Sequence, residues 1–443
     1  MKTTLHILLL IFLVSACAGR QQPVSTAPQE WLDLNRKFIS LYANGAYEDA
    51  LVTAQREVDI ASGFKPRDNA DLATSLNNLG VTLLALGRYD EAEPPLKQAL
   101  AMREKVLGPS HPEVATTLGN LGELLVAQGR PAEAEDALIR ALEIREARFG
   151  GENADMAETL GNLGELYYRK GLLDEGERLL RRALAIRERE LGPGSPQVAR
   201  TLDNLAGIEQ ARKKYFEAET LLERSLAIKE KALGPEHPWL IPTLTSLGEV
   251  LMAQGRMEDA EAAARRAVGV GEKAYGPDNV RLSIPLTSLG NLLRAQGQLD
   301  EAGKAYARAL ELRHNALPQD HIDIAISLGN LASIHYARGR FAEAKPLYER
   351  ALAITLEKNG QNNAEAAQLL HNLGVVNRRL GDLGQAETMF RHALAIRESL
   401  FGMADPSVAD TLDGLARTLK EAGDEDAAAR FAERAKAIRA KAW

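Results

Sequence analysis

The chain has 443 residues, of which 45% are apolar and 26% charged, a composition typical of folded soluble proteins and unlike that of disordered or fibrous chains. Its 54 basic and 61 acidic residues are well mixed and leave a net charge of -7, which excludes nucleic-acid binding through a strong basic field. A single cysteine excludes a disulfide scaffold and any multi-cysteine metal site. Aromatic residues make up only 5%, so the core must consist mainly of Leu and Ala.

The N-terminal segment is predicted to be a targeting signal. Residues 5–16 form an apolar run that follows Lys2 and is too short to span a bilayer, which is typical of the hydrophobic region of a secretory signal. The only cysteine, Cys17, comes directly after this run. The sequence VSAC at residues 14–17 resembles the lipobox of bacterial lipoproteins, in which the signal is cut before a cysteine that then carries the lipid.

This resemblance implies a signal peptide over residues 1–16 and a lipidated Cys17. Ala18 stands where an Asp would, by the same resemblance, favour retention in the inner membrane. We therefore expect an anchor in the outer membrane of a bacterial cell envelope, facing the periplasm. Residues 17–28 are polar and contain two prolines, which predicts a flexible tether. An ordinary secretory signal with an incidental cysteine is the alternative.

A 42-residue repeat occupies the rest of the chain, residues 29–443. One leucine recurs at this interval without insertion or deletion, at Leu79, Leu121, Leu163, Leu205, Leu247, Leu289, Leu331, Leu373 and Leu415. A glycine recurs with the same period from Gly45 to Gly423, with Lys213 as the exception, which gives ten units. A fixed period of this length predicts that successive units stack into one elongated solenoid.

Each unit is predicted to contain two helices. Apolar residues recur at helical spacing over residues 73–83 and again over residues 92–107, and Gly87 lies between them, where the chain must leave the helix with a positive φ. Small residues such as Gly80 and Ala92 mark the place where the two helices must approach closely. Residues suited to cap the N-terminus of the next helix form one column, His111, Asn153, Ser195, His237, Asn279, His321, Asn363 and Asp405.

This pattern resembles the tetratricopeptide repeat, whose glycine, tyrosine and alanine signature stands at residues 87–92 (GRYDEA). The unit is longer than the usual one of about 34 residues. Together with the segments LNNLG at residues 76–80 and RALAIRE at residues 182–188, it resembles the repeats of kinesin light chains and their bacterial relatives. The resemblance covers about Trp31 to Trp443 and implies an all-α solenoid, or superhelix, of about ten helix pairs, with a concave groove that binds protein or peptide partners.

An asparagine column is the best candidate for a binding site, and it consists of Asn78, Asn120, Asn162, Asn204, Asn330 and Asn372. Asparagine is a mediocre helix former, so its recurrence in the middle of a helix needs a reason. An amide both donates and accepts, so a ladder of amides could hold an extended peptide backbone, and the resemblance implies that this residue lines the groove. The alternative is that each asparagine bonds a neighbouring helix and fixes the geometry of the repeat.

Charged residues carry two further predictions. Glutamates three residues after the asparagine column, at Glu123, Glu165 and Glu249, predict a groove that is acidic to neutral and a ligand that is basic or neutral. Adjacent Arg–Glu pairs, as at residues 103–104 and 187–188, predict a solvated helix face with local ion pairing.

Units six and seven depart from the pattern together. Pro242 and Pro285 are expected about five residues into a helix, where proline removes a backbone hydrogen bond and usually causes a kink. Gly269 and Gly271 weaken the following helix by about 1 kcal/mol each. We therefore expect a change of curvature or a flexible joint near residues 237–290, with neutral drift as the alternative.

No motif in the sequence supports catalysis. The GxSxG, Walker and HExxH patterns are absent, and Cys17 is assigned to the lipid. His111, His237 and His321 share the N-cap column, and the remaining histidines form no pair at the spacing of one helical turn, so no metal site is expected. We expect no enzyme activity, no cofactor, no small-molecule substrate and no nucleic-acid partner.

The sequence therefore predicts a lipid-anchored, non-enzymatic scaffold that binds peptide segments or partner proteins in its concave groove. The motivation is Cys17 together with ten repeat units and no further domain. The alternative is a regulatory or assembly subunit of an envelope enzyme or secretion complex, whose activity would come from another protein.

Overall fold

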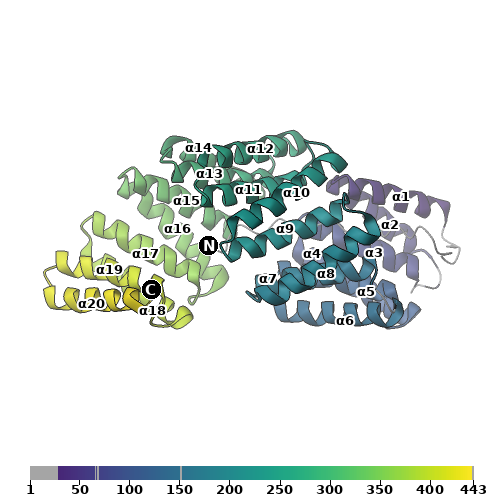
Figure 1. Cartoon of the computed structure of the whole chain (residues 1–443), viewed down its shortest axis with the longest axis horizontal. Coiled ribbons are helices and arrows are strands. Elements are labelled where there is room, and N and C mark those ends of the chain that lie inside the picture. Colours follow the sequence, from purple (N-terminus) through teal and green to yellow (C-terminus); the bar gives the residue numbers. More distant parts are fainter. Residues whose placement is uncertain (1–27, 65, 67–68, 150–151, 442–443) are drawn as a thin grey trace. The chain divides into compact units, whose positions relative to one another are not determined.

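The structure is a computed structural model, and it describes residues 28–64, 66, 69–149 and 152–441 (Figure 1). The predicted signal peptide, Cys17 and most of the predicted tether lie outside these residues. The described part contains twenty α-helices, one short 3-10 helix and no strand, and consecutive helices pack in pairs. The predicted all-α architecture of ten helix pairs is confirmed. None of the described helices is both long and apolar enough to cross a membrane.

The chain divides into two compact units, with the boundary between Gln254 and Gly255. Unit 1 contains α1 (Gln29–Ala43), α2 (Tyr47–Ala61), α3 (Ala70–Ala85), α4 (Tyr89–Leu107), α5 (Pro112–Ala127), α6 (Pro131–Phe149), α7 (Ala154–Arg169), α8 (Leu173–Leu191), α9 (Pro196–Ala211), α10 (Tyr215–Leu233) and α11 (Leu240–Ala253). Unit 2 contains α12 (Met257–Tyr275), η1 (Val280–Leu282), α13 (Ser283–Ala295), α14 (Leu299–Ala316), α15 (Ile322–Ala337), α16 (Phe341–Asn359), α17 (Ala364–Arg379), α18 (Leu383–Phe401), α19 (Pro406–Glu421) and α20 (Glu425–Lys441). The boundary lies within the stretch 237–290 that the sequence singles out.

The predicted capping hydrogen bonds are confirmed, and they lie directly before the α-helix in every repeat of the column except the sixth and seventh, where Trp239 stands at the N-cap of α11 and Asn279 caps η1. Every residue of the cap column accepts a hydrogen bond from a backbone N–H in the first turn that follows it. His111 does so with its ring Nδ1, which accepts from the N–H of Glu113 at 3.2 Å, whereas Asn153 uses its side-chain oxygen on the N–H of Met156 at 2.9 Å. These bonds satisfy N–H groups that have no partner within the helix, and so they fix where each first helix begins.

The turn inside each helix pair requires a left-handed residue. The glycines of the predicted column have φ between +73° and +87°, a region that costs other residues about 1–2 kcal/mol. Lys213 occupies this position in unit 1 and has a φ of +62°, and it is the only residue besides glycine with a positive φ in the described part of the chain. The chain therefore holds a strained turn at this one repeat.

The two helices of a pair touch where the sequence supplies its smallest side chains. A Cβ added to Gly122 of α5 would lie 2.6 Å from Cγ of Leu138 in α6, which is closer than real side chains allow. Ala92 and its equivalents Ala134, Ala218, Ala260, Ala302, Ala344 and Ala386 are fully buried. Unit 2 uses larger partners at the same crossing, because Phe390 lies 2.9 Å from the added Cβ of Gly374. The predicted close approach is confirmed.

The two prolines of repeats six and seven do not lie where the sequence predicts. Helix α11 begins at Leu240 and α13 begins at Ser283, so Pro242 and Pro285 occupy the third position of their helices rather than the fifth. A backbone N–H at this position has no partner within the helix, so proline removes no bond there. The predicted kink is therefore wrong. Instead, α11 and α13 have 14 and 13 residues, whereas α9 has 16.

Replacing Lys213 by glycine is expected to stabilise the protein. The glycine relieves the left-handed strain but makes the unfolded chain more flexible, so we expect a net gain of about 0.5–1 kcal/mol in the free energy of unfolding of unit 1. Urea unfolding monitored by far-ultraviolet circular dichroism measures it. The reciprocal Gly171→Ala variant, where φ is +78°, should lose a similar amount. A Lys213→Gly variant less stable than the wild type would contradict the strain.

Candidate functional site on the inner helices

The first helix of each repeat lies on the inner side of the helix stack. In unit 1, α1, α3, α5, α7 and α9 each contact the next odd-numbered helix as well as their own partner, whereas the even-numbered helices make no comparable contacts with one another in the described residues. In unit 2, α17 and α19 make the same contact. A curved stack brings the helices of its inner side together, so we call the odd-numbered helices the inner helices.

Within unit 1, the structure places the predicted asparagines on the inner helices but buries them. Asn78, Asn120 and Asn162 are 7%, 3% and 5% exposed. The Nδ2 of Asn78 donates to Oε2 of Glu57 at 2.9 Å, and the Nδ2 of Asn120 donates to Oδ1 of Asn77 at 2.8 Å. Asn204 is also buried, at 8%. The amides of Asn78, Asn120 and Asn162 therefore join neighbouring helices of unit 1, whereas the side chain of Asn204 has no hydrogen-bond partner among the described residues.

Within unit 2, the two remaining asparagines are more accessible. Asn330 of α15 and Asn372 of α17 are both half-buried. The Oδ1 of Asn372 accepts from Nε2 of Gln368 on its own helix at 2.9 Å, and the side-chain amide of Asn330 has no hydrogen-bond partner among the described residues. The same column therefore offers free amide groups in unit 2 and few in unit 1.

Two of the three glutamates predicted to line the groove of unit 1 are paired with arginines, whereas burial raises the pKa of the third, Glu249, to about 7. Arg200 of α9 reaches across α7, because its Nη2 donates to Oδ1 of Asn162 at 2.6 Å and to Oε1 of Glu123 at 3.2 Å. Arg169 pairs with Glu165 at 2.8 Å. Burial raises the pKa of the Glu123 carboxyl, while Arg200 opposes this shift. The charge of this inner face is therefore largely balanced within the protein rather than acidic.

The inner side of unit 1 is also closed by its own first repeat. A Cβ added to Gly45, in the turn between α1 and α2, would lie 3.9 Å from Cγ of Pro238, in the loop before α11. Tyr42 at the end of α1 is 3% exposed, and burial raises its pKa, with the charges of Glu123 and Arg200 also acting on it. The first and last repeats of unit 1 therefore approach each other across the inner side.

A column of buried cations, which the sequence interpretation missed, joins six of the repeats to the repeat that follows. Its members are Arg103, Arg145, Arg187, Lys229, Arg313 and Arg397, and each is at most 5% exposed. Each donates to the hydroxyl of a residue 14 positions later, on the next inner helix, at Thr117, Thr159, Thr201, Thr243, Ser327 and Thr411. Burial lowers the pKa of Arg187 to about 9, aided by the charge of Arg200.

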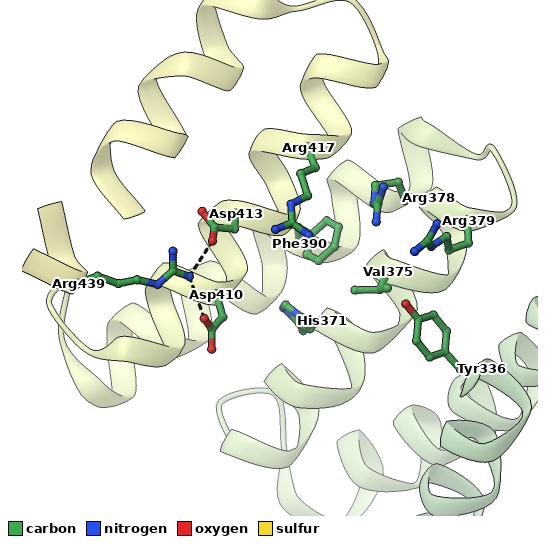
Figure 2. Close-up of a pocket in the computed structure, with 11 residues that line it drawn as sticks. Tyr336, His371, Val375, Arg378, Arg379, Phe390, Asp410, Asp413, Arg417 and Arg439 are labelled. Carbon is green, nitrogen blue, oxygen red and sulfur yellow. Dashed lines mark hydrogen bonds and ion pairs between the residues drawn. The ribbon is translucent and has the colours of Figure 1, made fainter. Parts of the chain in front are cut away.

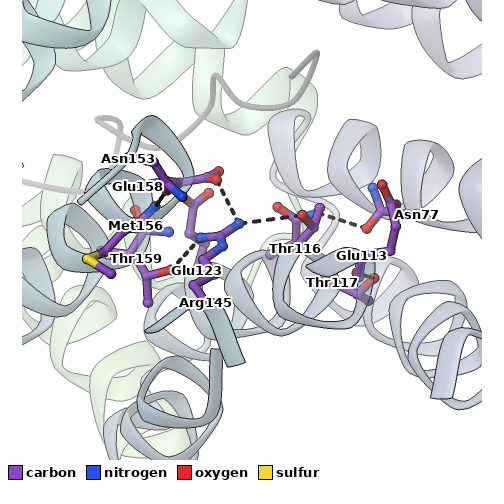
Figure 3. A network of polar contacts seen from close by, with 12 residues as sticks. Asn77, Glu113, Thr116, Thr117, Glu123, Arg145, Asn153, Met156, Glu158 and Thr159 are labelled. Atoms are coloured by element: carbon purple, nitrogen blue, oxygen red, sulfur yellow. Dashed lines mark hydrogen bonds and ion pairs between the residues drawn. The ribbon is translucent and has the colours of Figure 1, made fainter. Parts of the chain in front are cut away.

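Arg145 shows how completely such a cation is enclosed (Figure 3). Its guanidinium donates to Oγ1 of Thr159, to Oε2 of Glu158 at 3.0 Å and to Oγ1 of Thr116 at 3.4 Å. These partners lie on α5 and α7, on both sides of α6, which carries Arg145. A buried charge needs this number of hydrogen bonds to offset its desolvation, so the contacts also fix the spacing of the two inner helices.

The predicted solvated face with local Arg–Glu pairs is therefore wrong for the arginines. Successive helical residues point about 100° apart, so Arg187 turns inward while Glu188 stays at the surface. The glutamates pair with the next repeat instead. Glu104 lies 2.6 Å from Arg140, and Glu188 lies 2.5 Å from Arg224.

A signal for this column is present in the sequence. In two repeats of unit 2 the cation and its partner are both absent, because Gly271 is followed 14 residues later by Pro285 and Thr355 by Leu369. The first repeat has Ala61 at the cation position and keeps Ser75, whose hydroxyl accepts from Nε1 of Trp31 at 2.8 Å instead. Every buried cation of the column is followed by a hydroxyl residue 14 positions later. The presence of this hydroxyl residue distinguishes a buried structural arginine from an exposed one.

The histidines and acidic residues form no metal site in the described residues. His111 and His321 act as N-caps, as predicted, whereas His237 accepts from the N–H of Trp239, which is itself the N-cap residue of α11. His371 of α17 lies with its ring centroid 5.3 Å from that of Phe390, and burial lowers its pKa to about 4, aided by the charge of Arg397.

A pocket of about 370 Å³ opens among the inner helices of unit 2 (Figure 2). Residues of α15, α17 and α19 line it, together with Phe390 of α18 and Arg439 of α20. Arg439 donates to Asp410 at 3.0 Å and to Asp413 at 2.6 Å. This pocket gives unit 2 a hollow in which a ligand side chain could lie.

The Glu57–Asn78 contact predicts a dependence of stability on pH. Glu57 is fully buried, and burial raises its pKa from 4.5 to about 7, although the hydrogen bond from Asn78 opposes this. Because the folded-state pKa lies above the unfolded one, stability is lost as the pH rises from about 4.5 through about 7. Glu57→Gln, which keeps an acceptor for Asn78, should match the wild type near pH 4 and exceed its free energy of unfolding by roughly 1–3 kcal/mol at pH 8.

Urea unfolding at the two pH values measures this difference. The matched control is Glu48→Gln on the exposed side of α2, which should show no such pH-dependent gain. Equal stability of Glu57→Gln and the wild type at pH 8 would contradict the prediction.

Comparison with solved structures gives relatives of two kinds. BtubC (BKLC) from P. vanneervenii is 26% identical over 52% of this chain and 91% of its own, with a TM-score of 0.45. The kinesin light chain TPR-like repeats of Podosopora anserina are 25% identical over 47% of this chain and 98% of their own, with a TM-score of 0.41. A Rap protein complexed with Competence and Sporulation Factor is 16% identical over 84% of this chain and 98% of its own, with a TM-score of 0.56. No curated protein sequence matches the chain.

The sequence profile of the tetratricopeptide repeat matches most of the chain. The matched segments are residues 39–105, 71–147, 155–231, 197–273, 242–313, 281–357 and 365–441. They extend over both units and include the buried cation column and the glycine turns described above. The chain therefore belongs to the tetratricopeptide repeat family.

Proposed function

We propose that this chain is a non-catalytic, lipid-anchored scaffold that binds peptide segments of partner proteins along the inner helices of unit 2. The observation that carries the proposal is the different state of one repeat position in the two units. Asn78, Asn120 and Asn162 use their amides within the protein, whereas the amide of Asn330 is free and Asn372 bonds only to its own helix.

A free amide on an inner helix suits an extended backbone, because it donates to a peptide carbonyl and accepts from a peptide N–H without selecting a side chain. The Rap protein of similar fold was solved with Competence and Sporulation Factor bound, which supports a fold that accommodates a ligand. The tetratricopeptide segments cover the described chain, and we assign no catalytic role to any residue.

The anchor is the second part of the proposal. Cys17 follows an apolar run of signal-peptide length in the sequence VSAC, and a lipid on that cysteine would hold the repeats at a bacterial envelope membrane, facing the periplasm. The same inner face would also suit a regulatory or assembly subunit of an envelope complex, and the identity of the captured partner distinguishes the two roles.

The double variant Asn330→Ala/Asn372→Ala is expected to weaken partner binding. Partners are first captured by crosslinking in intact envelopes and identified by mass spectrometry, and their affinity is then measured with purified protein. Two lost hydrogen bonds of about 0.5–1.5 kcal/mol each should raise the Kd about tenfold. The control is Asn315→Ala, an exposed position on the even-numbered helix α14. A double variant that folds and binds like the wild type would exclude the asparagines from the site.

Replacing Cys17 by serine is expected to release the protein from membranes. Without a thiol there is no attachment point for the lipid, so the chain should move from the membrane fraction to the soluble fraction of fractionated cells. Mass spectrometry of the wild-type N-terminus should show a lipid on Cys17. A Cys17→Ser variant that remains equally membrane-bound would refute the anchor, and a wild type that is cleaved and unlipidated would favour an ordinary secretory signal.

A further inference from the structure

We propose that the pocket of unit 2 binds side-chain carboxylates of an acidic peptide segment through Arg379 and Arg417, with an adjacent apolar side chain on Val375. The inference rests on the proposed function and names the chemistry of the partner. It also reverses, for unit 2, the basic or neutral ligand that the glutamates of unit 1 suggest.

The charges around the pocket do not balance. Of its four arginines, Arg439 is paired with Asp410 and Asp413, and Arg378 is paired with Glu421 at 2.6 Å. Arg379 and Arg417 are exposed and have no carboxylate partner among the described residues. Two guanidinium groups at the mouth of one pocket therefore remain available to an anionic ligand.

The two free arginines come from neighbouring inner helices and border the same hollow (Figure 2). Arg379 is the last residue of α17, and its guanidinium carbon lies 6.0 Å from the centroid of the Phe341 ring, a cation–π contact that positions the side chain without neutralising it. Arg417 extends from α19 past Phe390. A guanidinium binds a carboxylate through two parallel N–H groups, which makes acidic side chains the natural ligands here.

The same repeat position has opposite charge in the two units. Arg417 is equivalent, by the 42-residue period, to Glu123, Glu165 and Glu249 of unit 1. In unit 1 the arginines that pair with two of these glutamates come from the chain itself, since Arg200 pairs with Glu123 and Arg169 with Glu165. In unit 2 the arginine is present and the matching carboxylate is not, which leaves that role to a partner.

The pocket also has an apolar part. Val375 and Phe390 contribute to its lining, and Phe390 is fixed between two inner helices because the Cβ positions of Gly374 and Gly414 lie 2.9 Å and 2.5 Å from its ring. A volume of about 370 Å³ is enough for one large apolar side chain and part of its neighbour. The expected partner segment therefore combines acidic residues with an apolar residue.

The test uses the full chain and an array of amidated, fluorescein-labelled octapeptides, in which two glutamates flank one leucine at varied spacing. We expect fluorescence anisotropy to show binding that weakens with added NaCl and is lost when glutamine replaces glutamate. Arg379→Ala and Arg417→Ala should each raise the Kd of the best peptide about tenfold, as expected for loss of a charge-assisted pair. Arg430→Ala, an exposed arginine on α20 that is not part of the pocket lining, should leave it unchanged.

Several results would overturn the inference. The first is an array in which no glutamate peptide binds better than its glutamine counterpart. The second is an equal affinity of the Arg417→Glu and Arg430→Glu variants for the best peptide, since both substitutions change the net charge by the same amount. Glutamine peptides with a free C-terminus are a further control. If these bind as well as the glutamate peptides while amidated glutamine peptides do not, the pocket recognises a terminal carboxylate and not a side-chain carboxylate. If captured partners depend on Asn330 and Asn372 but not on Arg379 and Arg417, the inference fails while the proposed function stands.

Discussion

The buried cation that links six of the repeats to their successors is the contact on which much of the stack depends. A guanidinium removed from water is costly unless its N–H groups find partners, and here the partners are a hydroxyl and, for Arg103, a carbonyl in the first turn of the following inner helix. The buried cation of one helix therefore has its hydrogen-bond partners only when the next inner helix is correctly placed. Two repeats of unit 2 lack both the cation and the hydroxyl, and in the first repeat, which has Ala61 at the cation position, the hydroxyl of Ser75 accepts from Trp31 instead.

The same reasoning explains the contrast between the two inner faces. In unit 1, Arg200 reaches a carboxylate two repeats away, and the amides between them are used along the way. A ligand binds weakly to an inner face whose polar groups are already paired, because internal hydrogen bonds must break before the ligand can form its own. In unit 2 the corresponding groups are half-buried or free, and ligand recognition there breaks fewer internal bonds.

Much of the fold follows from local rules that a sequence reveals directly. The N-caps, the glycine turns and the close approach at Gly122 each depend on residues near one another in the chain, and all three predictions are confirmed. The burial of Arg187 was not predicted, because adjacent Arg and Glu residues also occur on solvated helix faces, and only the 14-residue spacing to Thr201 distinguishes the two cases. The state of each asparagine depends on how strongly the stack curves, which involves contacts up to several repeats away. No single repeat encodes that, so Asn120 and Asn330 have the same local sequence role but different surroundings.

The contact between Gly45 and Pro238 places a limit on how unit 1 can change in length. Open solenoids gain or lose whole repeats by duplication and deletion, since each repeat touches only its neighbours. In unit 1 the first turn meets the loop before the last helix, and this contact forms only with the present number of repeats between them. Inserting or removing 42 residues inside unit 1 would separate Gly45 from Pro238 and expose Tyr42 with the charges around it. The contact therefore constrains the number of repeats in this unit.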